Sequence, residues 1–158
     1  MNRNSGLTIT ELLVVLVITG ILAAIAFPTL VDLIEIAIGQ NNVQIIKNAI
    51  DSQQVQYIEV GSFSKNWENL NVGQNKTETH EFKIDEQSNN EYSIIKGIPK
   101  HESVKGYISG VEVVKNKKEL YFKAVICEAR KPGVKAFEKV EIEFKKRRIK
   151  CEHSKKVS

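Results

Sequence analysis

Glu11 is the residue of this sequence whose position most needs a chemical explanation, because its carboxylate stands at the start of an apolar run. The stretch SGLTITELLVVLVITGILAAIAFP, residues 5–28, contains no other charged side chain. An ionised carboxylate in a medium of low dielectric constant is costly unless an opposite charge lies beside it. Glu11 therefore needs either water and lipid headgroups around it or a cationic partner.

The two cysteines, Cys127 and Cys151, are the second pair of residues that could do chemistry. If the domain that carries them lies outside the cytoplasm, the oxidising compartment and the even count favour one disulfide between them. Closing a loop of about 25 residues would add on the order of 3 kcal/mol by restricting the unfolded chain. Two buried free thiols are the alternative.

A basic run near the C-terminus is the third feature. KKRRIKCEHSKK, residues 145–156, holds seven Lys and Arg within twelve residues, which gives a positive potential suited to DNA phosphates or anionic polysaccharide. The run has no aromatic residue on which bases could stack, and a solvated basic end is the alternative reading. The candidate anion-binding residues are Lys145, Lys146, Arg147, Arg148 and Lys150.

Motifs for catalysis are absent from the sequence. We find no phosphate-cradling glycine loop, no nucleophile elbow and no CxxC pair. The three histidines, His80, His101 and His153, are isolated from one another and are expected to be solvated. The sequence therefore predicts a protein that is not an enzyme, with no cofactor and no metal site.

The element that must position Glu11 is a long apolar helix. Residues 12–31 carry no charge, and twenty residues at about 1.5 Å per residue match the roughly 30 Å of a bilayer core. A cleaved signal peptide is one alternative, since Ala24-Ile25-Ala26 has the form of a cleavage site, but Glu11 cancels the charge of Arg3 ahead of the core. A static membrane anchor is another, and it leaves Glu11 unexplained.

Beyond residue 31 the helix is expected to continue as an amphipathic helix to about Glu59, with Gly61 as its stop signal. Its apolar residues follow helical spacing and should pack on the globular domain. They are Ile34, Ile38, Ile45, Ile46, Ala49, Ile50 and Tyr57.

The remaining sequence is typical of β-strands. HEFKI from His80 alternates apolar and polar residues, and β-branched or aromatic stretches follow. These stretches begin at Glu91, Val104, Glu119 and Lys139. The short intervals favour an antiparallel meander, so the predicted fold class is α+β, with one long helix laid on a small antiparallel sheet.

The N-terminus resembles that of type IV pilins and the related pseudopilins. In that family a short basic leader ends in Gly, a Thr and a spaced Glu follow, and a Gly and a Pro stand further along the helix. Gly6, Thr8, Glu11, Gly20 and Pro28 occupy those places, and the stretch GILAAIAFP is close to the family's usual sequence. Leu7 replaces the usual Phe, and Thr10 stands where an aliphatic residue is commoner.

A second resemblance covers the domain. QQVQYIEVGSFSKNWENLNVG, residues 53–73, is followed by NEYSI, VKGYISGV and AVICEARKPG. These stretches are similar in sequence and order to those of cyanobacterial pilin-like proteins of the secretion G/H type. Taken alone, they read equally well as helix end, turn and core.

The resemblance implies a processing and assembly role for the N-terminus. A prepilin peptidase would cut after Gly6 and methylate the amine of Leu7, leaving 158 − 6 = 152 residues. Glu11 would pair with the N-terminal ammonium of a neighbouring subunit in the filament. Gly20 and Pro28 would weaken the helix between them. Gly is a poor helix former, and Pro28 has no amide hydrogen to donate to the carbonyl of Ala24.

The expected organisation is a leader (1–6), an apolar membrane and assembly helix (7–31), its amphipathic continuation (32–60) and a β-sheet domain (61–158). The resemblance implies a structural subunit of a type IV pilus that supports motility, adhesion or DNA uptake. Its partners would be other pilin subunits, the prepilin peptidase and the inner-membrane assembly machinery. A single-pass precursor in the inner membrane would expose its domain outside the cytoplasm.

Three alternatives stay open. One is a pseudopilin of a type II secretion system, and another is a minor pilin that binds DNA through the basic run. The third is a monomeric anchored or secreted protein outside this family.

Overall fold

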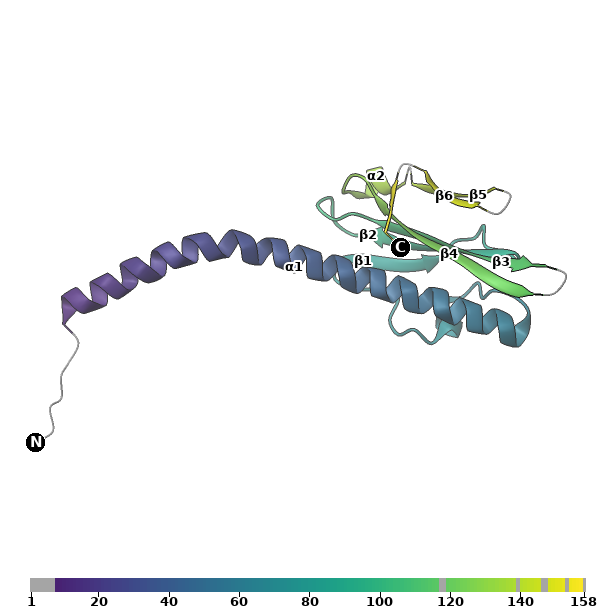
Figure 1. Ribbon diagram of the computed structural model, residues 1–158, viewed down its shortest axis with the longest axis horizontal. Helices are drawn as coiled ribbons and strands as arrows, with labels where there is room; N and C mark the ends of the chain where they lie inside the picture. Colours follow the sequence, from purple (N-terminus) through teal and green to yellow (C-terminus); the bar gives the residue numbers. More distant parts are fainter. Residues whose placement is uncertain (1–7, 117–118, 139, 146–147, 153, 158) are drawn as a thin grey trace, which may run out of the picture. The chain divides into compact units, whose positions relative to one another are not determined.

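The computed structural model describes residues 8–116, 119–138, 140–145, 148–152 and 154–157. The chain forms two compact units, residues 1–40 and 41–158. The first unit is helical in its described part, and the second holds the sheet (Figure 1). The long helix α1 (Ile9–Val60) contributes residues to both units.

In the first unit, α1 is a helix with apolar side chains on every face. These side chains are exposed: Leu16 is 64 % exposed and Phe27 is 68 % exposed. The segment is long and apolar enough to cross a membrane. Pro28 lies inside this helix, and a side chain added at Gly20 would meet nothing within 4 Å.

The helix continues through the second unit and ends where expected. The N–H of Gly61 donates to the carbonyl of Tyr57 at 2.9 Å, and Gly61 has a φ of 81°. This left-handed conformation is the usual way in which glycine ends a helix. The sequence-based prediction of one long helix is confirmed.

The sheet has five strands in the order β1-β2-β3-β4-β7, all antiparallel to their neighbours (Figure 1). The strands are β1 (His80–Ile84), β2 (Tyr92–Pro99), β3 (Tyr107–Lys115), β4 (Leu120–Ala129) and β7 (Ser154–Lys156). The first four of the five predicted strands form the predicted meander, and the α+β fold class is confirmed. The fifth predicted strand, from Lys139, forms β5 (Glu141–Lys145), which pairs with β6 (Arg148–Glu152) in a separate two-stranded sheet instead of joining the meander.

The second half of α1 packs on one face of this sheet. Its buried apolar residues are Ile46, Ala49, Ile50 and Tyr57. With Phe82, Ile95, Val111 and Ile126 of the strands they form one apolar cluster. The 3₁₀-helix η1 (Trp67–Leu70) adds Trp67 and Leu70 to it. Two of the predicted stripe residues, Ile34 and Ile38, are instead exposed, so the buried stripe starts after them.

A second cluster covers the other face. It joins Ile108 and Val125 of the sheet to Phe137 of the short helix α2 (Val134–Phe137). The hairpin formed by β5 (Glu141–Lys145) and β6 (Arg148–Glu152) packs here through Phe144, whose ring stacks on Tyr92 with centroids 4.2 Å apart. A Cβ at Gly110 would come within 2.7 Å of Phe144, so only glycine leaves room for this ring.

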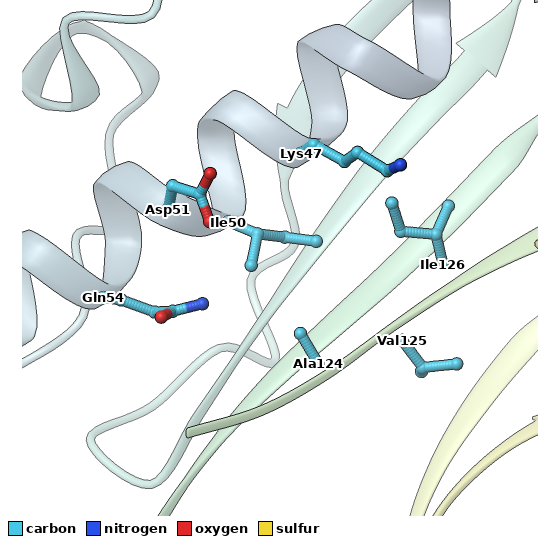
Figure 2. A pocket seen from close by; sticks show the side chains of 7 residues that line it. All are labelled: Lys47, Ile50, Asp51, Gln54, Ala124, Val125 and Ile126. Carbon is cyan, nitrogen blue, oxygen red and sulfur yellow. The ribbon is translucent and has the colours of Figure 1, made fainter. Parts of the chain in front are cut away.

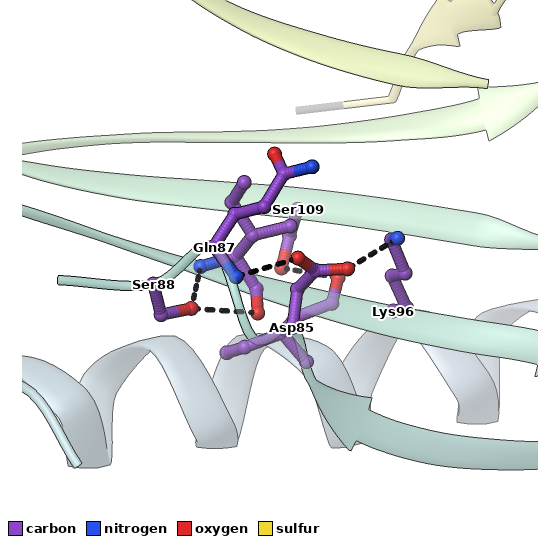
Figure 3. Close-up of polar contacts among 7 residues, drawn as sticks. Asp85, Gln87, Ser88, Lys96 and Ser109 are labelled. Atoms are coloured by element: carbon purple, nitrogen blue, oxygen red, sulfur yellow. Dashed lines mark hydrogen bonds and ion pairs between the residues drawn. The ribbon is translucent and has the colours of Figure 1, made fainter. Parts of the chain in front are cut away.

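The β1–β2 turn is closed by polar contacts around Asp85 (Figure 3). The N–H of Gln87 donates to Oδ1 of Asp85 at 2.9 Å, and Lys96 forms an ion pair with the same carboxylate. Burial by itself would raise the pKa of Asp85, but the hydrogen bonds from Lys96 and Gln87, with the charge of Lys96, lower it. The Oγ of Ser88 accepts the N–H of Ile94 at 2.9 Å, which joins the turn to β2.

Two expectations are corrected. The basic run is not an unstructured tail, because its described backbone forms the end of β5 and all of β6 and β7, while the side chains of Lys155 and Lys156 are solvent-exposed as expected. His80 is fully buried rather than solvated, whereas His101 is exposed as expected. His153 lies outside the described residues.

Candidate functional site

Glu11 lies in the first turn of α1 and closes a ring of hydrogen bonds with Thr8. The N–H and the Oγ1 hydroxyl of Thr8 donate to Oε2 of Glu11 at 2.9 and 2.7 Å. In return, the N–H of Glu11 donates to Oγ1 of Thr8 at 3.3 Å. This is a capping box, in which residues three apart satisfy each other's free amides at a helix start.

The capping box gives Glu11 a role that we did not derive from the sequence, although the Thr-x-x-Glu spacing of Thr8 and Glu11 is a recognised signal for it. Among the described residues, no cation lies within ion-pair distance of Glu11, so Thr8 is its partner within the chain. The predicted processing residues, Gly6 and Leu7, lie outside the described residues. The pairing of Glu11 with a processed N-terminus stays a prediction.

The helix that follows Glu11 presents apolar side chains without any covering partner within its unit. From Leu12 to Val31 the exposed fractions of the large apolar side chains lie between 42 % for Val31 and 68 % for Phe27. An exposed apolar surface of this kind is stable only in lipid or against other apolar helices. The described geometry can therefore insert into a membrane or bundle with similar helices.

Gly20 and Pro28 lie in this apolar helix, and hydroxyl side chains beside them bond the helix backbone. The Oγ1 of Thr19 donates to the carbonyl of Leu16 at 3.2 Å and also to that of Val15. The Oγ1 of Thr29, next to Pro28, donates to the carbonyl of Ala26 at 2.8 Å. In a bilayer, where water is excluded, such bonds would supply these carbonyls with partners. The helix-weakening role of Gly20 and Pro28 stays a prediction.

The disulfide between Cys127 and Cys151 is confirmed. It joins β4 to β6, with the two Cα atoms 5.8 Å apart, and Cys127 is fully buried. It fixes the β5–β6 hairpin over the second apolar cluster, to which Cys127 and Cys151 both belong.

The candidate anion-binding residues are placed only in part. Lys145 lies opposite Arg148 in the strand register at the end of the hairpin, and Lys150 lies opposite Glu143. Their side chains, like all of Lys146 and Arg147, lie outside what the structure describes. The described part of the chain contains no group of His, Cys, Asp and Glu that could hold a metal ion.

One open cavity of about 220 Å³ lies between α1 and β4 (Figure 2). Its apolar floor comes from Ile50, Ala124 and Ile126, and Lys47 and Asp51 stand at its rim. Nothing in its lining resembles a catalytic arrangement, since it lacks a nucleophile with an adjacent base.

Two family models match the chain. The model for type IV pilin-like G and H proteins matches residues 37–152, and the model for the prokaryotic N-terminal methylation motif matches residues 1–27. The second match contains Gly6, Thr8 and Glu11, and the first contains most of the sheet domain and both cysteines. Neither a curated protein nor a solved structure matches the chain significantly.

Proposed function

This chain belongs to the type IV pilin-like G and H family, and we propose that its mature form is a structural subunit of a type IV pilus. The observation that carries the proposal is the Thr8–Glu11 capping box at the head of an exposed apolar helix, inside the match to the methylation motif. The motif and the apolar helix fit a membrane-anchored precursor.

In the proposed pathway, a prepilin peptidase cuts after Gly6 and methylates the new N-terminus at Leu7. The freed amine keeps its positive charge, and it enters a bundle of apolar helices from several subunits. Glu11 of a neighbouring subunit supplies the opposite charge, because either charge alone would be costly in that environment. Each subunit in the filament thus has its axial position fixed by one ion pair.

The sheet domain remains outside the cytoplasm in this proposal and covers the filament. The disulfide supports this location, because disulfides persist in oxidising compartments. The partners are other pilin subunits and the inner-membrane assembly machinery. A pseudopilin of a type II secretion system would use the same N-terminus, so the choice between these two classes depends on the filament itself.

The first experiment is the intact mass and N-terminal sequence of the protein recovered from its own membranes. A chain that starts at a methylated Leu7 would support the proposal. A start after Ala26 would indicate a secreted domain, and an intact Met1 a static anchor; either would overturn it. Electron microscopy of the cell surface would then separate a long pilus from a short pseudopilus.

DNA binding is a secondary proposal that rests on the basic run. Lys155 and Lys156 are exposed on β7, and the sequence places five more basic residues on or between β5 and β6. Phosphate contacts of this kind weaken steeply with salt. A mobility shift that persists at physiological salt, and is lost when these lysines and arginines are replaced by alanine, would support it. Binding that vanishes at moderate salt would reduce it to non-specific attraction.

A further inference from the structure

A connected set of polar side chains joins β1 to α1 through His80. His80 is fully buried, and its Nε2 lies 2.8 Å from the carbonyl oxygen of Lys105. Its Nδ1 lies 2.9 Å from Oγ1 of Thr79, and that oxygen accepts a hydrogen bond from Nδ2 of Asn42 at 3.3 Å. Among the residues whose burial is described, Asn42 is the first buried side chain along α1, and Ile46 is the next. His80 is therefore linked, through Thr79, to the point where the helix begins to pack on the sheet.

One backbone carbonyl sets the direction of these bonds. The carbonyl of Lys105 can only accept, so Nε2 of the neutral His80 ring must carry the hydrogen. Nδ1 is then an acceptor, and the hydroxyl of Thr79 donates to it. Because its hydrogen is engaged by Nδ1, the Thr79 hydroxyl can only accept from α1, and Nδ2 of Asn42 is the donor. The neutral histidine thus determines which end of the Asn42 carboxamide faces Thr79.

The other end of the Asn42 carboxamide contacts Thr77. Oγ1 of Thr77 donates to Oδ1 of Asn42 at 3.4 Å, and it lies 3.4 Å from the carbonyl of His80 as well. The same oxygen accepts the N–H of His80 at 3.0 Å. The hydroxyl of Thr77 thus has a second acceptor within reach, the carbonyl of His80, which does not depend on how Asn42 is turned.

The surroundings of the His80 ring favour its neutral form. Burial lowers the pKa of His80, the bond to the carbonyl of Lys105 opposes this, and the charge of Lys100 after β2 lowers it again. From β3, the ring of Tyr107 lies 5.4 Å from that of His80. Burial and the carboxylate of Glu128 on β4 raise the pKa of Tyr107 to about 12, so this hydroxyl stays neutral where a histidine titrates. Glu128 also pairs with Nζ of Lys105 at 3.6 Å.

The groups bonded to the ring carry no charge that could offset a proton. They are the hydroxyl of Thr79 and a backbone carbonyl, and α1 contributes the uncharged Asn42. On β1 itself, Glu81 forms ion pairs with Lys76 and Lys83 at 3.5 and 3.3 Å. Glu78, which precedes Thr79, is exposed. A proton on the ring must therefore be accommodated by rearranged hydrogen bonds rather than by an ion pair.

Protonation reverses one bond, and the next bond must respond. With a proton from solvent on Nδ1, both ring nitrogens of His80 donate, so Oγ1 of Thr79 becomes the acceptor and its own hydrogen turns toward Asn42. There it meets Nδ2, which is also a donor. Turning the carboxamide over removes this conflict, because Oδ1 then accepts from Thr79 and Nδ2 donates to Oγ1 of Thr77. The hydroxyl of Thr77 donates to the carbonyl of His80, and each of these buried groups again has a partner.

We propose that His80, Thr79 and Asn42 form a pH-sensitive switch, in which a proton on His80 turns over the carboxamide of Asn42. A carboxamide carries a donor and an acceptor side by side, so Asn42 can bond Thr79 in either direction. A carboxylate or an apolar side chain at this position could not. The switch keeps α1 bonded to the sheet in both protonation states, and it does not depend on whether the chain forms a pilus or a pseudopilus.

The test is an NMR titration of the full chain in detergent micelles that follows the ring nitrogens of His80 and the carboxamide of Asn42 together. Above the midpoint we expect the neutral ring with its hydrogen on Nε2. As the pH falls, the carboxamide resonances of Asn42 should move with the same midpoint as His80. Nuclear Overhauser contacts of the Nδ2 hydrogens should pass from Thr79 to Thr77. The carboxamide of Asn48, on an exposed face of α1, is the internal control and should not follow His80.

Two variants test whether the hydroxyl carries the coupling. Thr79→Val removes the hydroxyl and keeps the branched shape, so His80 should still titrate while Asn42 no longer follows it. Thr79→Ser keeps the hydroxyl, and Asn42 should follow His80 as in the wild type. If Thr79→Val fails to fold, the wild-type titration decides by itself.

Four results would overturn the switch. They are Asn42 resonances that stay constant through the midpoint of His80, Asn42 following His80 in Thr79→Val, a neutral ring with its hydrogen on Nδ1, and unfolding of the wild type before His80 gains its proton. The last result would mean that the folded protein holds one arrangement of these bonds alone.

Discussion

Gln53 of α1 and Ser64 are joined by two hydrogen bonds that close a ring between a helix side chain and a loop backbone. Nε2 of Gln53 donates to the carbonyl of Ser64 at 2.9 Å, and Oε1 accepts the N–H of Ser64 at 2.8 Å. Nε2 also donates to Oγ of Ser93 on β2 at 3.1 Å. Gln53 is fully buried, so this one carboxamide ties the helix, the loop after it and the sheet together.

Replacing Gln53 with Leu should therefore destabilise the domain although it adds apolar surface. The N–H and C=O of Ser64 would lose their buried partners, and each orphaned group costs about 1–3 kcal/mol. We expect the free energy of unfolding, measured with denaturant in detergent, to fall by roughly 2–4 kcal/mol. Gln44→Leu, on an exposed face of the same helix, is the control and should stay within about 0.5 kcal/mol of wild type. A Gln53→Leu protein as stable as this control would contradict the role of the ring.

The disulfide provides a second stability prediction. Cys127 and Cys151 are 24 residues apart, and removing such a cross-link frees the unfolded chain by about 3 kcal/mol. We expect the double variant Cys127→Ala, Cys151→Ala to unfold at lower denaturant concentration, with faster hydrogen exchange in β5 and β6. Reductant should destabilise the wild type and leave the double variant unchanged. A wild type indifferent to reductant would contradict this expectation.

His80 should make stability depend on pH. Burial lowers the pKa of His80, the hydrogen bond between Nε2 and the carbonyl of Lys105 at 2.8 Å opposes this, and the charge of Lys100 lowers it further. The unfolded chain, with an ordinary histidine pKa of about 6.5, then binds the proton more readily than the folded protein. The contribution of His80 is complete above this pH and is lost as the pH falls toward the lower folded pKa.

We expect the free energy of unfolding to decrease between about pH 7 and pH 5, and His80→Gln to flatten this part of the profile. Denaturant titrations at a series of pH values measure it. His101→Gln is the matched control, because His101 is exposed, and it should keep the wild-type slope. If His80→Gln and the wild type have parallel profiles, another group is responsible.

The burial of His80 could have been predicted from the sequence. His80, Phe82 and Ile84 alternate along β1, so the spacing that predicted the strand also places His80 on the face of Phe82. The prediction that His80 is solvated did not take this alternation into account. Its ring lies 6.1 Å from that of Phe82 and 5.4 Å from that of Tyr107, in an apolar setting that tolerates a histidine because both ring nitrogens have partners.

The strand from Lys139 was predicted and forms β5, but the strands β6 and β7 of the basic run were not predicted. The pattern of Ile142 and Phe144 in β5, with Cys151 in β6, is apolar at alternate positions, but the lysines and arginines between them suggest a solvated end. Tertiary contacts stabilise the hairpin: Phe144 stacks on Tyr92, and the disulfide holds β6 to β4. Strand preference depends on such neighbours more than on composition. The helix and the meander, with strong local periodicity, needed no such context.

The assembly role of Glu11 can be separated from its role in the helix start, because a capping box accepts Gln as well as Glu at this position. Glu11→Gln should keep the bonds to Thr8, membrane insertion and processing, while removing the charge that pairs with a neighbouring N-terminus. Thr8→Ala is the complementary variant: it keeps the charge and removes the hydroxyl, at a cost of about 1 kcal/mol to the helix start.

We expect Glu11→Gln to reduce incorporation into filaments by about tenfold or more, because the ammonium of Leu7 in the next subunit would be buried without a partner. Thr8→Ala should reduce it far less. Both variants are expressed with the wild type, and the ratio of variant to wild type in sheared filaments is compared with that in membranes by mass spectrometry. Equal ratios for Glu11→Gln would show that the carboxylate serves the helix start alone, and a larger defect for Thr8→Ala would assign assembly to the hydroxyl.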